Sequence, residues 1–179
     1  MTHGVDICSL LLRIALAITM FAHGYNHAFG GGKLAGTARW FESIGIRPGR
    51  VHAAFATLTE LGVAPLLALG LLTPLGAAGV VGTMTVALVA NHLKNGYFIF
   101  RPGEGYEYVL FLILTALGLA ALGGGAWSVD NPIADHWTGL GEWLHGWHGL
   151  LIAVIAGGGG AAVLLVTSWR PERTPAAVG

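Results

Sequence analysis

The chain has 179 residues, of which 54% are hydrophobic and only 10% are charged. A water-soluble domain of this length would need far more charged residues on its surface, so the composition predicts a membrane protein. Nine basic and nine acidic residues give a net charge of zero, which argues against a nucleic-acid-binding role. The single cysteine, Cys8, excludes an intrachain disulfide, so any redox chemistry would need a bound cofactor or a partner protein.

Five apolar stretches are long enough to cross a hydrocarbon core of about 30 Å, which takes roughly 20 helical residues. The first lacks a basic start and a small-residue cleavage site, so we expect it to remain as a membrane span and not to be a signal peptide. Only the TPLG turn separates the second and third stretches, which are expected to form an antiparallel hairpin. The five predicted spans cover about 7–29, 51–72, 74–93, 105–122 and 149–169.

The basic residues predict the orientation, because short loops rich in Lys and Arg stay in the cytoplasm. The loops after the first and third spans and the C-terminal tail contain basic residues, whereas the other two loops contain none. We therefore expect a multi-pass protein of the plasma (inner) membrane, with its N-terminus outside and its C-terminus in the cytoplasm. The remaining basic residue, Arg13, lies in the outer part of the first span, where it would extend toward the surface or pair inside the bundle.

The outer segment between the fourth and fifth spans is rich in tryptophan, which prefers the headgroup zone. We expect this segment to lie along the outer membrane surface. It also holds three histidines, which would either form an extracellular metal site or, as we favour, be solvated. The residues concerned are Trp127, Trp137, Trp143 and Trp147, with His136, His145 and His148.

These elements predict an all-α polytopic membrane protein, a four-helix transmembrane bundle plus a fifth C-terminal transmembrane helix. The expected units are a four-helix domain at 7–130, an interfacial loop at 131–148, and a final helix with a short cytoplasmic tail at 149–179. Glycines within the spans would allow close helix packing. Four consecutive glycines at 157–160 are expected to make the fifth span locally pliable.

A layer of polar residues lies in the cytoplasmic halves of the first four spans. His23 and His27 are four residues apart and share one helix face. Glu60 lies about 12 Å into its span from Val51, at a rise of 1.5 Å per residue. A carboxylate at that depth costs several kcal/mol unless it is protonated, paired or hydrated. The full layer comprises His23, Asn26, His27, His52, Glu60, Asn91, His92, Tyr106 and Glu107.

Histidine and carboxylate side chains at this depth suit three chemical tasks. They can pass protons to a quinone, ligate a transition metal, or form the titrating site of a transporter. A structural alternative is a Glu60–His23 pair that holds the bundle together. For His27, Asn26 and Asn91 a simple interfacial position is as good an interpretation as a functional one, and for His52 it is the favoured one.

Five sequence blocks between about residues 9 and 130 carry a family resemblance. They are LLLRIALAITMFAHGYNHAFG, GTARWFESIGI, LTELGVAPLLALGLLTPLGAAG, TMTVALVANHLKNGYF and GYEYVLFLILTALGLAALGGGAWSVD. In order and spacing they resemble the bacterial DoxX family. The resemblance implies a four-helix membrane bundle with polar positions at His23, Glu60, His92 and Glu107.

The same resemblance implies a role in membrane redox chemistry. Related DoxD-type proteins are subunits of a thiosulfate:quinone oxidoreductase, and DoxX-type proteins are described as membrane partners of oxidative-stress and sulfur-handling enzymes. The family commonly has a lysine where this chain has His27, so a role that requires a fixed positive charge does not transfer to this position. The fifth span and the Trp-rich loop lie beyond the family core.

We therefore expect the membrane subunit of a quinone-linked oxidoreductase assembly, with menaquinone or ubiquinone as cofactor and other subunits of a redox or respiratory complex as partners. Glu60 and Glu107 would be the catalytic proton donors or acceptors. The cofactor-binding residues would be His23, His92, His27 and Asn91, and no metal site is expected. The alternatives are a non-catalytic accessory or assembly subunit of a larger membrane complex, and a small-molecule or metal transporter.

Overall fold

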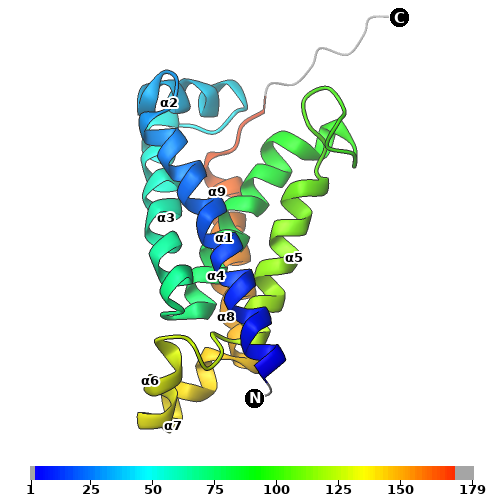
Figure 1. The fold of residues 1–179 in the computed structure, drawn as a ribbon. Helices are drawn as coiled ribbons and strands as arrows, with labels where there is room; N and C mark the ends of the chain where they lie inside the picture. The colour runs from blue at the N-terminus through cyan, green and yellow to red at the C-terminus, as the bar shows by residue number, and fades with distance from the viewer. Residues whose placement is uncertain (1–2, 172–179) are drawn as a thin grey trace, which may run out of the picture.

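The computed structural model describes residues 3–171 (Figure 1). Apart from one bridge between Ile46 and Trp169, the regular elements of this part are helices. Four of them are long and apolar enough to cross a membrane, and a fifth, α5, is apolar but shorter. The predicted all-α membrane fold is confirmed.

Each predicted span contains one of these helical segments. The third and fifth spans each include a wider, π-helical turn: η1 follows α4, and η4 joins α8 to α9. The bounds are α1 His3–Phe29, α3 Gly49–Leu69, α4 Thr73–Ala87, η1 Leu88–His92, η2 Leu93–Asn95, α5 Glu107–Leu122, α8 Gly146–Ile152, η4 Ala153–Gly158 and α9 Gly159–Ser168.

The connection between α3 and α4 is the tight antiparallel turn that the sequence predicts. Gly70 ends α3 in the left-handed conformation, with φ of 64°, and Leu71 N donates a hydrogen bond of 2.9 Å back to Leu66 O. Pro74 then lies in the first turn of α4, where a missing N–H costs nothing.

Short helices lie at both ends of the bundle, in segments for which the sequence predicted loops. At one end α2 (Lys33–Ser43) connects α1 to α3, and at the other α6 (Asp130–His136), α7 (Thr138–Gly141) and η3 (Glu142–Leu144) follow α5 (Figure 1). We name these the α2 end and the α6 end.

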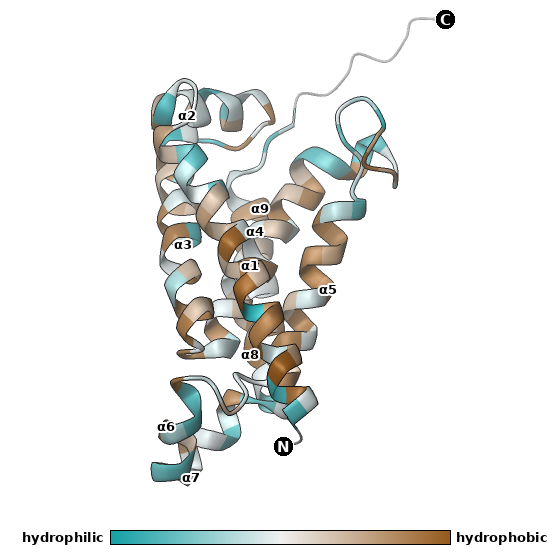
Figure 2. Ribbon diagram, viewed as in Figure 1, coloured by the Kyte–Doolittle hydropathy of each residue, from teal (hydrophilic) through white to brown (hydrophobic). Residues whose placement is uncertain are grey.

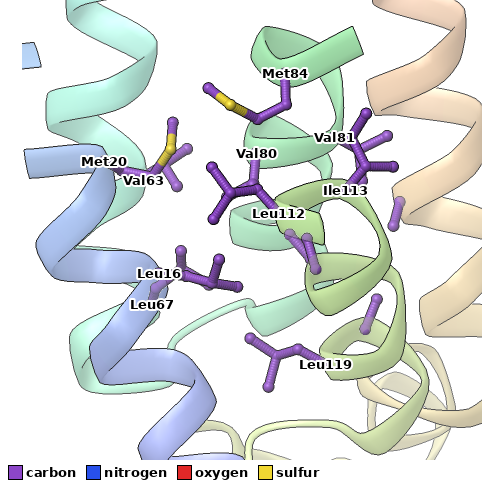
Figure 3. Packing of buried hydrophobic residues seen from close by; sticks show 14 of the residues in the cluster. Leu16, Met20, Val63, Leu67, Val80, Val81, Met84, Leu112, Ile113 and Leu119 are labelled. Carbon is purple, nitrogen blue, oxygen red and sulfur yellow. The ribbon is translucent and has the colours of Figure 1, made fainter. Parts of the chain in front are cut away.

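The main core lies between α1, α3, α4 and α5, with η4 against its side (Figure 3). Its large side chains include Leu16 and Met20 of α1, Leu67 of α3 and Leu119 of α5, all at most 1% exposed. Outward-facing positions are also apolar, as Leu58 and Phe111 illustrate at 71% and 66% exposure, and apolar residues dominate the long helices (Figure 2). An apolar exterior of this kind is expected where lipid replaces water around the protein.

A second, smaller core closes the α2 end. Ala38 and Phe41 of α2 pack with Ile46, Ala53 and Ala90. The amphipathic pattern of α2 explains why it folds as a helix on top of the bundle.

The end of α9 is fastened to this same α2 end. Arg170 N donates to Gly45 O at 2.7 Å, and Trp169 Nε1 donates to Ile44 O at 3.0 Å. The fifth transmembrane segment is therefore tied to the connection between α2 and α3.

Candidate functional site

A buried histidine–carboxylate pair joins α1 to α3 near the α2 end. His27 Nδ1 lies 2.9 Å from Glu60 Oε2, and Glu60 is only 3% exposed. The two atoms are too poorly aligned for a hydrogen bond, and both are buried without another partner among the described residues. The two side chains therefore form a close polar pair in which neither His27 Nδ1 nor Glu60 Oε2 has a hydrogen-bond partner among the described residues.

Two neighbouring residues shape the surroundings of this pair. Gly24 lies one turn before His27 on α1, and a Cβ added there would be 3.1 Å from Glu60 Cβ and 2.8 Å from Leu61 Cγ. The absence of a side chain lets α1 approach α3 next to the carboxylate. On the other side, Phe41 of α2 meets the His27 ring edge-on, with centroids 6.1 Å apart.

The structural pairing therefore differs from the one expected. Glu60 pairs with His27, not with His23, which is half-buried and has no hydrogen bond or ion pair to any residue of 3–171. His27 was interpreted as interfacial or functional with equal weight, because sequence spacing alone does not show which of two histidines on one face lies level with Glu60.

His92 and Asn91 belong to a separate polar group. His92 Nδ1 lies 2.9 Å from Glu104 O, and its Nε2 lies 3.3 Å from Asn91 Nδ2. Asn95 donates to Asn91 O at 3.2 Å and to Glu104 O at 3.1 Å. These side chains hold the connection 96–106 against the end of the third span.

Glu107 occupies a third position, in a surface hollow at the start of α5. Its Oε2 accepts a hydrogen bond of 3.2 Å from Ile99 N. The hollow measures about 370 Å³, and Tyr97, Tyr108 and Phe111 line it together with Glu107. The expected single polar layer is thus divided into the His27–Glu60 pair, the His92–Asn91 group and the Glu107 hollow.

The α6 end holds a buried polar network around Arg13. The Arg13 side chain is 1% exposed and donates from Nη1 to Ala68 O at 3.0 Å and from Nη2 to Trp127 O at 2.7 Å. Arg13 thus lies inside the bundle, where it bonds to main-chain carbonyls and forms no salt bridge with a residue of 3–171.

Two buried aspartates complete this network. Asp130 accepts hydrogen bonds from Leu72 N at 2.6 Å and Thr73 N at 2.8 Å, so its carboxylate covers the start of α4. Asp6 accepts from Ala126 N at 2.8 Å, and Ser9 Oγ donates to Gly123 O at 2.7 Å. Asp6 lies in the first turn of α1, just before the first predicted span, and Asp130 lies after the fourth, so neither falls within a predicted span.

Within residues 3–171, no three His, Cys, Asp or Glu side chains lie close enough together to hold a metal ion. This applies both to the His27–Glu60 pair and to the histidines of the α6 end. His148 Nδ1 lies 3.2 Å from Glu142 O, and its ring lies beside Trp143 with centroids 4.7 Å apart.

One comparison with known proteins gives a match, and it covers the first three spans. The DoxX family model matches residues 8–93, which run from α1 to the first residue of η2 and include His23, His27, Glu60 and His92. The comparisons with curated proteins and with solved structures found no significant match. Over residues 8–93, a little under half of its length, this polytopic helical membrane protein is similar to the DoxX family.

Proposed function

We propose that this protein is the membrane subunit of a quinone-linked oxidoreductase assembly and that the hollow at Glu107 receives the quinone ring. The observation that carries the proposal is an open, largely apolar hollow at the end of a membrane helix that is lined by one carboxylate and two tyrosines. When bound, a quinone supplies a two-electron, two-proton acceptor for the assembly.

The residues of the hollow fit such a group chemically. Glu107 and the hydroxyls of Tyr97 and Tyr108 provide hydrogen-bonding groups for two carbonyl oxygens. Phe111 and Leu114, on later turns of α5, continue the lining with apolar surface. Glu107 would hold or release a proton at its carboxylate, which is the role expected for it from the sequence.

His92 and Asn91 act in this proposal as positioning residues. Their hydrogen bonds fix the connection 96–106, and the same connection carries Tyr97 and Ile99 into the lining of the hollow. Backbone bonds support it as well, since Glu107 N donates to Tyr97 O at 2.8 Å. In this proposal His92 does not contact the quinone, as the sequence had led us to expect, but holds the connection 96–106 that shapes the hollow.

His27, His23 and Glu60 lie on α1 and α3, apart from the elements that line the hollow. The unused hydrogen-bonding capacity of the His27–Glu60 pair supports a proton-holding role within the same assembly. Its burial between α1 and α3 equally favours the second candidate function, a non-catalytic accessory subunit in which the pair fastens two helices.

The orientation belongs to the same proposal. The α2 end carries Lys33, Arg39 and Arg50, and we place it in the cytoplasm on the basis of the positive-inside rule. The α6 end then faces outward, in a bacterial plasma membrane.

The test begins with purification of the intact assembly from native membranes in mild detergent, followed by identification of co-purifying subunits and quinone by mass spectrometry. Quinone reduction is then compared between wild type and Glu107→Gln, which keeps the shape and an acceptor oxygen. We expect a fall of about 100-fold or more, as for loss of a general acid–base group, with unchanged assembly.

Glu104→Gln is the matched control, because Glu104 is an exposed carboxylate of the same connection and does not line the hollow. Its turnover should equal that of wild type. Unchanged turnover in Glu107→Gln would overturn the proposal. Loss of the assembly in Glu60→Gln, with normal turnover per assembled complex, would favour the accessory function.

A further inference from the structure

A second hollow lies at the α2 end, and its lining is strongly basic. It measures about 620 Å³ and lies between the end of α1, one side of α2 and the start of α3. Lys33 and Arg39 come from α2, and Arg50 from α3. None of the residues discussed for quinone chemistry lines it.

The charges of this hollow are not balanced by the described part of the protein. Lys33, Arg39 and Arg50 form no salt bridge with any residue of 3–171. The acidic residue of the lining, Glu42, accepts a hydrogen bond of 3.2 Å from Gly49 N at the start of α3. Three positive charges and one negative charge leave the lining with a net charge of +2.

The rest of the lining is apolar. Ala28 of α1 and Leu34, Ala35 and Ala38 of α2 contribute it. A site for a free inorganic anion has no need of such surface, whereas the glycerol and upper acyl region of a lipid does. The combination of basic and apolar groups therefore selects an amphipathic anion.

The hollow also lies at the ends of membrane-spanning helices, where lipid headgroups are expected. It is formed where the transmembrane helix α1 ends and α3 begins. A tyrosine and a tryptophan of the adjoining helices are exposed, Tyr25 of α1 at 53% and Trp40 of α2 at 43%. Aromatic residues of this kind mark the membrane–water interface.

We propose that this hollow binds the phosphate group of an anionic phospholipid, with Arg39, Arg50 and Lys33 as its cationic partners. The glycerol and first acyl carbons lie against Leu34 and the alanines. The proposal is independent of the quinone function, because it concerns different residues and a different ligand.

Native mass spectrometry and thermal unfolding of the purified full-length protein test the proposal, with phosphatidylglycerol and phosphatidylcholine added at equal concentrations. We expect wild type to retain phosphatidylglycerol selectively and to be stabilised by it. The double variant R39Q/R50Q should bind phosphatidylglycerol at least about tenfold more weakly, because each basic group near an anionic lipid contributes on the order of a factor of five.

The matched control is K94Q/R101Q, which also removes two positive charges near the same end but outside the hollow. It should bind phosphatidylglycerol as wild type does. Equal loss in both double variants would overturn the proposal in favour of general surface attraction. Equal stabilisation by inorganic phosphate alone would also overturn it, because the occupant would then be a free anion.

Glu42→Gln provides a variant whose expected change is a gain. The glutamine keeps an acceptor for Gly49 N and removes the one negative charge of the lining. Phosphatidylglycerol binding should become several-fold tighter, so the proposal remains testable even if R39Q/R50Q does not fold. Unchanged or weaker binding in Glu42→Gln would contradict it.

Discussion

Arg13 Nη2 donates a hydrogen bond of 2.7 Å to Trp127 O, although the two residues lie 114 positions apart in the chain. The same guanidinium donates to Ala68 O at the end of α3. One buried side chain therefore joins the first span, the second span and the connection that follows α5. The segment that follows α5 is therefore hydrogen-bonded to the bundle through Arg13.

Replacing Arg13 by methionine should destabilise the protein by about 3 kcal/mol, because it removes the buried guanidinium and its hydrogen bonds to three carbonyls, those of Leu67, Ala68 and Trp127. Thermal or denaturant unfolding in mild detergent measures the change. Arg47→Gln is the control, since Arg47 is exposed and its side chain makes no hydrogen bond within the described residues. Its stability should stay within about 0.5 kcal/mol of wild type. Equal stability of Arg13→Met and Arg47→Gln would show that the buried network contributes nothing.

Asp130→Ala should destabilise the protein by about 1–3 kcal/mol, because the buried amide of Thr73 and the partly buried amide of Leu72 lose their acceptor at the start of α4. Asp135→Ala is the matched control on the same short helix, where the side chain is exposed. Limited proteolysis should cleave the segment after α5 faster in Asp130→Ala than in Asp135→Ala. Identical cleavage rates would contradict the role given to Asp130.

The five spans were predictable because each is a long apolar stretch, a property that the sequence displays locally. The polar network of the α6 end was not predictable, because the partners of Arg13 lie far along the chain, at the end of the second span and after the fourth. The helix α2 was missed for a different reason: its few apolar residues, Ala38 and Phe41 among them, pack on a second core that only the folded bundle creates.

The candidate site shows the same limit. The residue types of the polar layer could be predicted from their depth and cost in the membrane, and Glu60 is indeed buried beside a histidine. The division of these residues into separate groups could not be predicted, because helices that lie side by side at one end of the bundle can diverge toward the other end. His92 is also turned to the connection 96–106 at the end of a π-helical turn, and the sequence gives no clear signal for such a turn.

A double-mutant cycle between His27 and Glu60 should show a coupling free energy of about 1 kcal/mol or more, because the two side chains are in direct contact and buried. The variants are His27→Gln, Glu60→Gln and the double variant, with unfolding in detergent as the measurement. The control cycle pairs Glu60→Gln with His23→Gln, which should be additive within about 0.5 kcal/mol. Coupling in the control cycle and none in the first would reassign the partner of Glu60 to His23.

The glycine run of the fifth span allows a direct test of how this helix is attached to the bundle. A Cβ added at Gly157 would collide with the Ala78 carbonyl of α4 and lie 3.0 Å from Val81 Cβ, whereas one added at Gly159 would meet no atom within 4 Å. Gly157→Leu should therefore destabilise the protein by about 1–3 kcal/mol through overpacking. Gly159→Leu should be neutral or stabilising by up to about 1 kcal/mol, since leucine favours the helix more than glycine does.

Unfolding in detergent, together with cysteine crosslinking between α4 and η4, distinguishes the two glycine variants. The yield of the crosslinked product should fall in Gly157→Leu and stay at the wild-type level in Gly159→Leu, because only the first substitution separates η4 from α4. If both variants lost stability equally, the run would matter for its conformation and not for its contact with α4. The close approach of Gly82 to the Gly157 carbonyl, where an added Cβ would lie at 3.2 Å, favours the contact.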